Sequence, residues 1–167
     1  MFVRVKTLIL GVGNLLLSDE GFGVHFVRNL ERNYQFPDEV ELCDVGTLGL
    51  LATHKLEDAE RVYLVDALAL DGEPGEWRRY RKDDFLAGRV PAQLSPHQAG
   101  VREMLVVSEL RGCCPAEVHL IGVIPASLAP GCGLSPVLAE QCDRLGEELV
   151  AELRTQGLAV LPRALPG

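Results

Sequence analysis

The sequence predicts an α/β fold of three layers, in which a largely parallel, twisted sheet of about five strands has helices on both faces. Short apolar runs alternate with segments of helical periodicity along nearly the whole chain, which is the order of a parallel sheet with crossover helices. The runs are apolar throughout, as expected for strands that are buried on both faces. A length of 167 residues with 47% hydrophobic residues fits a single domain over 1–167.

The first half of the chain contains three predicted strands and two predicted helices. Residues 5–10 form a β-branched and leucine run that stops at a Gly-Val-Gly-Asn turn. Apolar positions recur at helical spacing over 22–33, and a second, short helix is predicted over 48–56. Two more apolar runs, 40–43 and 61–65, each end at an aspartate and are predicted as buried strands.

The second half adds two predicted strands. Residues 76–81 follow a Pro-Gly turn, and their charges favour an edge position in the sheet. Residues 118–124 are almost entirely apolar and end at Pro125, so we predict another buried strand there.

Two Ser-Pro pairs mark the starts of two further helices. In Ser95-Pro96 and in Ser135-Pro136, serine suits the N-cap and proline suits the first helical position. The inner stripe of the final helix is formed by Leu138, Cys142, Leu145, Leu149 and Leu153. The tail after Gln156 contains Pro and Gly and is expected to be loosely held.

Charge and cysteine content exclude several classes of function. The formal net charge of -8, from 16 Lys and Arg against 24 Asp and Glu, repels phosphate backbones, so we expect no nucleic-acid partner. Five cysteines without a C-x-x-C pair indicate reduced thiols in the cytoplasm. The apolar run 7–17 is broken by glycines and has no cleavage site, so it is not interpreted as a secretory signal. No stretch approaches the roughly 18 apolar residues of a membrane span, and no membrane association is expected.

Acidic residues follow three of the predicted strands. Asp19 and Glu20 follow the first strand across a short loop, Asp44 follows the second and Asp66 follows the third. Ligands of open α/β sheets bind outside the carboxyl ends of the strands, where His97 at a helix start can face the same edge. Two or three carboxylates with an imidazole suit a divalent transition metal, and they equally suit acid/base catalysis on a bound water.

Each of these residues also has a structural interpretation. An aspartate at a strand end, such as Asp44 or Asp66, often only accepts hydrogen bonds from a loop. Asp19 or Glu20 can stabilise the positive end of the first helix. A helix N-terminus keeps the His97 ring neutral, which is the form that a metal requires.

The remaining histidines and common motifs do not indicate another site. We expect His25 and His119 to have core or surface roles and His54 to be solvated. There is no H-E-x-x-H, no G-x-S-x-G and no phosphate-binding G-x-x-x-x-G-K-[ST] motif. Residues 11–13 suggest a dinucleotide loop, but Leu16 stands where the third glycine is needed, so no tightly bound organic cofactor is expected.

Five segments of the sequence together resemble the nickel-iron hydrogenase maturation endopeptidases. They are, in order, 11–24 (GVGNLLLSDEGFGV), 44–47 (DVGT), 65–67 (VDA), 95–98 (SPHQ) and 122–125 (GVIP). The resemblance runs from about Leu8 to the final helix. It departs from the family pattern at Val45, where many members have a second glycine after the aspartate.

This resemblance implies a hydrolase, a metal-dependent or aspartyl-type endopeptidase that acts once per substrate. It would remove the carboxy-terminal extension from the precursor of the hydrogenase large subunit after nickel insertion. The family's metal-binding Glu, Asp and His correspond to Glu20, Asp66 and His97, to which the resemblance assigns metal binding and catalysis. Nickel would be carried by the precursor and held by its cysteines, and it would therefore belong to the substrate.

The same resemblance implies that Asp44, Gly46 and Thr47 line the substrate cleft. In one mechanism the nickel polarises the scissile carbonyl or activates water. In another, Asp66 or Glu20 is the general base and the metal only positions the precursor. The alternative function is a non-catalytic, metal-sensing checkpoint protein that binds the same precursor. The family suggests a cytoplasmic monomer that meets its partner transiently.

Overall fold

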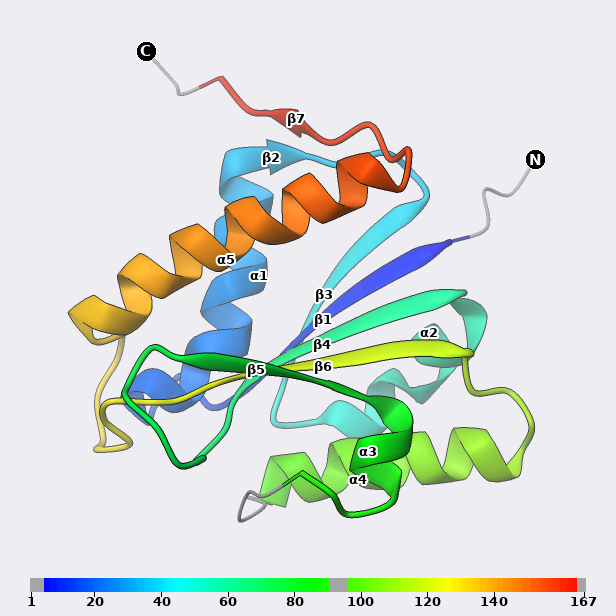
Figure 1. Ribbon diagram of the computed structural model, residues 1–167, viewed down its shortest axis with the longest axis horizontal. Coiled ribbons are helices and arrows are strands. Elements are labelled where there is room, and N and C mark those ends of the chain that lie inside the picture. The colour runs from blue at the N-terminus through cyan, green and yellow to red at the C-terminus, as the bar shows by residue number, and fades with distance from the viewer. Residues whose placement is uncertain (1–4, 91–95, 165–167) are drawn as a thin grey trace.

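The computed structural model describes residues 5–90 and 96–164, and the side chains of Pro96 and His97 lie outside that description. A twisted five-stranded sheet runs through its centre (Figure 1). The strand order is β3-β1-β4-β6-β5, and all neighbours are parallel except β5 and β6. The strands are β1 (Thr7–Val12), β3 (Val40–Gly46), β4 (Arg61–Ala67), β5 (Trp77–Arg81) and β6 (Glu117–Val123). The predicted α/β fold with a largely parallel sheet is therefore confirmed.

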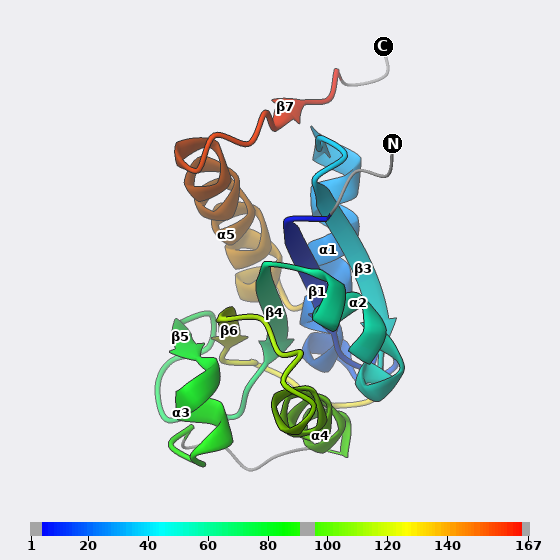
Figure 2. The ribbon, with the colours of Figure 1, turned by 90° about the vertical axis from the view of Figure 1, so that its right-hand side faces the viewer.

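Helices cover the sheet on both faces, as Figures 1 and 2 show. One face carries α1 (Phe22–Asn33) and α5 (Pro136–Thr155). The other face carries α2 (Thr53–Asp58), α3 (Lys82–Leu86) and α4 (Pro96–Leu110). Two short 3-10 helices, η1 (Ser18–Gly21) and η2 (Gly49–Ala52), precede α1 and α2. Among the described residues, no helix combines the length and the apolar character needed to cross a membrane.

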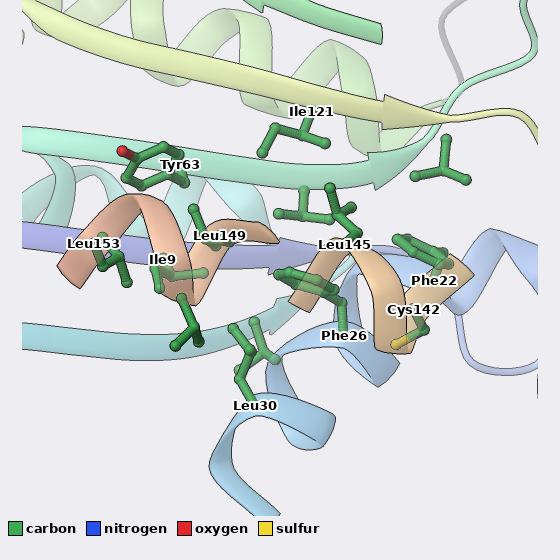
Figure 3. Close-up of a cluster of buried hydrophobic side chains, with 14 of the residues drawn as sticks. Ile9, Phe22, Phe26, Leu30, Tyr63, Ile121, Cys142, Leu145, Leu149 and Leu153 are labelled. Carbon is green, nitrogen blue, oxygen red and sulfur yellow. The ribbon is translucent and has the colours of Figure 1, made fainter. Parts of the chain in front are cut away.

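Neighbouring residues of one strand face opposite layers, which explains why a central strand such as β1 is buried and largely apolar along its whole length. In β1, Ile9 enters the core beneath α1 and α5, whereas Leu8 and Leu10 enter the core beneath α4. Figure 3 shows the first core, where side chains of α1 and α5 meet over the sheet. The stripe predicted for the final helix is the buried face of α5, formed by Leu138, Cys142, Leu145, Leu149 and Leu153.

The predicted elements of the first half are present, and two strands are longer than predicted. α1 covers the predicted residues 22–33. β3 and β4 continue past the apolar runs and include Asp44 and Asp66 themselves, because their ladders continue. Gly11 of β1 pairs with Asp44, and Asp66 pairs with Gly122 of β6. Two acidic residues expected just after strands therefore lie within the last residues of strands.

The second half matches the prediction less closely. The charged segment predicted at 76–81 is the outer strand β5, as expected, but α3 directly after it was not predicted. α4 begins at Pro96, while Ser95, its predicted N-cap, lies outside the described residues.

The tail after α5 is held in place up to residue 164, so the expectation of a loose tail is wrong for this part. A two-stranded antiparallel sheet joins β2 (Tyr34–Gln35) to β7 (Leu161–Pro162). Val160 is buried in the core beneath α1 and α5. The Arg163 amide donates a 2.8 Å hydrogen bond to the Asn33 carbonyl. These partners are distant in sequence, so local composition did not reveal them.

The order of the strands places a switch point between β1 and β4. From β1 the chain passes through α1 to β3 on one side, and then through α2 to β4 on the other side of β1. In open α/β sheets, ligands bind outside the carboxyl ends of the strands at such a point.

Candidate active site

Two of the predicted site residues lie at the switch point. Glu20 belongs to η1, which follows β1 after the loop 13–17, and it is half-buried. Asp66 is the penultimate residue of β4, the strand next to β1. Gly11 of β1 is aligned with Val65 of β4 in the sheet, and Asp66 is the next residue after Val65. The structure therefore brings the segments that carry Glu20 and Asp66 to one edge of the sheet, which we call the carboxyl edge.

The Asp66 side chain is directed to the face of the sheet that α4 covers. It is 2% exposed, and its Oδ1 accepts a 2.8 Å hydrogen bond from the Ala67 amide. A small, mostly apolar void beside it is lined by Val12, Leu64, Leu68, Phe85, Gln98, Val101 and Leu120. Leu64 and Leu68 belong to the core on the α4 side, which agrees with the alternation along β4.

The first turn of α4 is attached to the end of β4. Gln98 is buried, and its Nε2 donates a 2.7 Å hydrogen bond to the Ala67 carbonyl. His97 precedes Gln98 in the same helical turn, so its backbone lies beside the strand end that carries Asp66. Its side chain lies outside the described residues.

Metal binding by Glu20, Asp66 and His97 stays a prediction. Within the described side chains, which omit that of His97, no three His, Cys, Asp or Glu side chains converge as a metal-binding group. The chemistry of the set nevertheless fits a divalent transition metal, because carboxylate oxygens and a neutral imidazole are suitable ligands.

A glycine lets the loop after β1 fold back on itself. Gly13 has φ +149°, and a Cβ there would lie 2.1 Å from the Glu20 carbonyl oxygen. The Asn14 amide donates to this carbonyl at 3.1 Å, and the Gly13 amide donates to the Gly46 carbonyl at 2.9 Å. The amides of this loop thus fix the backbone of Glu20 and join it to the end of β3.

A second glycine brings the start of α1 against the sheet. A Cβ on Gly23 would lie 2.0 Å from the Val65 carbonyl oxygen and 2.3 Å from that of Val12. This close approach holds the first turn of α1 over the ends of β1 and β4. Since Glu20 lies just before this turn, the contact also sets the distance of Glu20 from the switch point.

Asp19 has a structural role that the sequence did not indicate. It is fully buried. Its carboxylate accepts hydrogen bonds from the amides of Ala126, Ser127 and Ser135 at 2.7 to 3.0 Å, and from the Ser135 hydroxyl at 2.8 Å. Asp19 therefore joins η1 to the loop between β6 and α5. These donors lie 107 to 116 residues later in the chain, beyond the reach of a local motif.

The same bonds change the expected role of Ser135. Ser135 occupies the N-cap position of α5, but its side chain makes no capping hydrogen bond within the helix. Its hydroxyl donates to Asp19 instead, so the Ser-Pro pair marks the helix start correctly while the serine serves the loop contact.

Replacing Asp19 by asparagine should lower the free energy of unfolding by about 2–4 kcal/mol. Asparagine would replace one acceptor oxygen by an NH2 donor, which would face backbone amides that can only donate. Urea denaturation followed by circular dichroism measures the change. Exposed Asp71 gives a matched Asp71→Asn control, which should stay within about 0.5 kcal/mol of the wild type. Equal stabilities of the two variants would contradict this role of Asp19.

The predicted cleft residues lie at the end of β3. Asp44 is exposed and forms a 3.0 Å ion pair with Arg28 of α1. It also accepts a 3.1 Å hydrogen bond from the Gly46 amide. Val45 is an extra residue relative to β1, since Gly11 faces Asp44 and the next pair in the ladder involves Gly46. Such bulges redirect a strand end, and Thr47 follows as an exposed residue on the carboxyl edge.

The positions of His119 and His54 agree with the core and solvated roles expected for them. His119 is buried in β6, where its ring stacks on Tyr63 at 5.1 Å and its Nε2 lies 3.1 Å from Glu117. His54 is exposed. His25 is partly buried in α1, and burial, followed by the nearby Arg28 charge, lowers its pKa.

Comparison with known proteins gives consistent matches over nearly the whole chain. A family model described as hydrogenase maturation protease matches residues 24–152. The hydrogenase 2 maturation protease of Escherichia coli (strain K12) is 33% identical over 159 residues, which cover 95% of this chain and 97% of that protein. The hydrogenase expression/formation protein HupD of Rhodobacter capsulatus is 38% identical over 160 residues, covering 95% of this chain and 76% of that protein.

Solved structures agree with the sequence matches. The hydrogenase maturating endopeptidase HybD from E. coli superimposes with a TM-score of 0.86 at 35% identity, covering 95% of this chain and 98% of that one. The [NiFe] hydrogenase maturation protease HybD from Thermococcus kodakarensis gives a TM-score of 0.69 at 25% identity, with coverages of 89% and 98%.

Proposed function

Because the chain belongs to the hydrogenase maturation protease family, we propose that it removes the carboxy-terminal extension from the precursor of a nickel-iron hydrogenase large subunit after nickel insertion. Membership supports a peptidase that acts in hydrogenase maturation. The position of the cut and the dependence on nickel are the parts that we propose.

One observation carries the proposal more than any other. Glu20 and Asp66 come from separate segments and lie at the switch point between β1 and β4, where open α/β sheets bind their ligands. The first turn of α4, which carries His97, is bonded to the end of β4 through Gln98 and the Ala67 carbonyl, and this supports including His97 in the site. Two carboxylates and an imidazole are a suitable set both for contacting nickel and for moving a proton.

In this proposal the three side chains bind the nickel that the precursor carries, and so place the scissile peptide at the carboxyl edge. A carboxylate, Asp66 or Glu20, then accepts a proton from the attacking water. The water oxygen bonds to the scissile carbonyl carbon, the C–N bond breaks, and the leaving amine takes up a proton. Asp44, Gly46 and Thr47 would guide the segment that leads to the cut.

Mass spectrometry of the precursor tests the proposal directly. Purified protein is mixed with nickel-loaded precursor, and the precursor should lose the mass of its extension. A parallel sample with metal-free precursor should remain intact, because the three side chains would then have no metal to bind. Equal cleavage of both samples would overturn the dependence on nickel. A stable complex without any loss of mass would support the checkpoint function instead.

A further inference from the structure

An open pocket of about 410 Å³ lies between α1 and the beginning of α5. His25, Arg28 and Arg32 line one side of it from the same face of α1, because their spacings are three and four residues. The other lining residues are Asn29, Gly133, Leu134, Ala139, Cys142 and Asp143. The pocket adjoins the carboxyl edge, since Arg28 also forms the ion pair with Asp44 at the end of β3.

The lining of this pocket contains more positive than negative charge. Asp143 is the acidic residue in its wall, and it already accepts a 2.8 Å hydrogen bond from Asn29 Nδ2. Arg32 donates to the Asn29 amide oxygen at 3.2 Å and has no ion pair with an acid in the described part of the chain. The lining therefore contains two guanidinium groups and one carboxylate, and because Arg28 is paired with Asp44 outside the lining, Arg32 is the cation of the pocket without an ion pair among the described residues.

His25 lies in the same wall of the pocket. Its pKa is lowered, first by burial and second by the Arg28 charge, and Asp44 opposes this shift. Its Nε2 is buried and has no hydrogen-bond partner among the described residues. An anion in the pocket would favour the protonated form of the ring.

We propose that the pocket binds the terminal carboxylate of the precursor's extension, through Arg28, Arg32 and His25. This inference rests on the proposed function and names the feature by which the extension is recognised. Every carboxy-terminal extension ends in a carboxylate, and arginine binds this group through paired N–H donors. Arg28 contacts Asp44, so a segment that passes the end of β3 arrives at the pocket.

Nuclear magnetic resonance can follow His25 while a synthetic peptide of the extension is added. The free-acid peptide should shift the His25 ring signals to saturation and raise the pKa of His25. Amidation of the peptide terminus should weaken binding about tenfold, the effect of losing one charge-assisted contact. A third peptide keeps the terminal carboxylate and carries amides in place of its acidic side chains, and it should bind like the first.

The variant Arg32→Gln tests whether the peptide binds in this pocket or elsewhere on the surface. Arg32 is exposed, so the variant should fold, and it should bind the free-acid peptide about tenfold more weakly. The matched control is Arg144→Gln, because Arg144 pairs with Glu140 on α5 outside this pocket and its loss should leave binding unchanged.

Several results would overturn the inference. These are no binding, equal binding of the free-acid and amidated peptides, or equal effects of the Arg32 and Arg144 substitutions. Weaker binding of only the third peptide would overturn the assignment to the chain terminus and indicate an acidic side chain as the ligand. Cleavage of intact precursor by the wild type is measured separately, so failure of the pocket does not imply failure of the proposed protease.

Discussion

Replacing Asp66 by asparagine should reduce cleavage of nickel-loaded precursor by a factor of about 10³ or more, while the protein stays folded. Asparagine keeps the volume of the side chain and an oxygen for the Ala67 amide, whose hydrogen bond measures 2.8 Å. It removes the negative charge that the proposed mechanism uses, both for contact with nickel and for accepting a proton. The rate of mass loss from the precursor measures the effect, and thermal unfolding reports on the fold.

The matched control is an aspartate at the opposite end of β4, Asp58. Asp58 is exposed at the end of α2, just before β4 begins, so Asp58→Asn removes the same charge far from the carboxyl edge. This control should cleave at the wild-type rate. If Asp66→Asn also cleaves at that rate, Asp66 has no part in the reaction and only supports the loop after β4.

Replacing Gly23 by alanine should lower the free energy of unfolding by more than about 4 kcal/mol. The added Cβ would meet the backbone carbonyls of Val65 and Val12 at 2.0 and 2.3 Å. Backbone atoms in the centre of a sheet cannot move aside as a flexible side chain can, so α1 must lift away from β1 and β4. Urea denaturation measures the loss, and low yield of folded protein would agree with it.

Gly100 supplies the control for this substitution. It also lies within a helix, α4, but nothing lies within 4 Å of the position of its Cβ. Gly100→Ala should therefore stabilise the protein by up to about 1 kcal/mol, through helix propensity alone. A destabilisation of the two variants by equal amounts would show that helix geometry, and not the contact with the sheet, decides the result.

The elements that could be predicted from the sequence are those whose signals are local. Helical periodicity located α1 to the residue, apolar runs located β1, β3, β4 and β6, and the charged segment after a Pro-Gly turn located β5. Strand ends were placed too early at Asp44 and Asp66, because an apolar run stops at the first charge while the hydrogen-bonded ladder continues. The antiparallel pairing of β2 with β7 was missed, since its partners are far apart in the chain.

In the candidate site, too, local sequence signals indicated the residues, whereas contacts between distant segments could not be predicted. Strand-end position indicated Glu20 and Asp66 as candidates before the family resemblance singled them out, because parallel strands bring their carboxyl ends to one edge. It also selected Asp19, but could not separate this residue from Glu20, its neighbour. Only the fold shows that Asp19 turns inward to donors of a distant loop.

The side chains of β4 alternate between the two cores, and this alternation limits the sequence changes that the strand can accept. Tyr63 and Val65 belong to the core beneath α1 and α5, whereas Leu64 belongs to the core beneath α4, and Asp66 shares the side of Leu64. A one-residue slip of this strand would exchange the two sets and carry the acid to the wrong layer. The same slip would bury mismatched side chains along the whole strand. A chain whose β4 packs correctly against both cores therefore also has Asp66 on the α4 side of the sheet. An insertion within β4 would therefore disturb the packing of both cores and also the position of Asp66, the residue that we propose to act in cleavage.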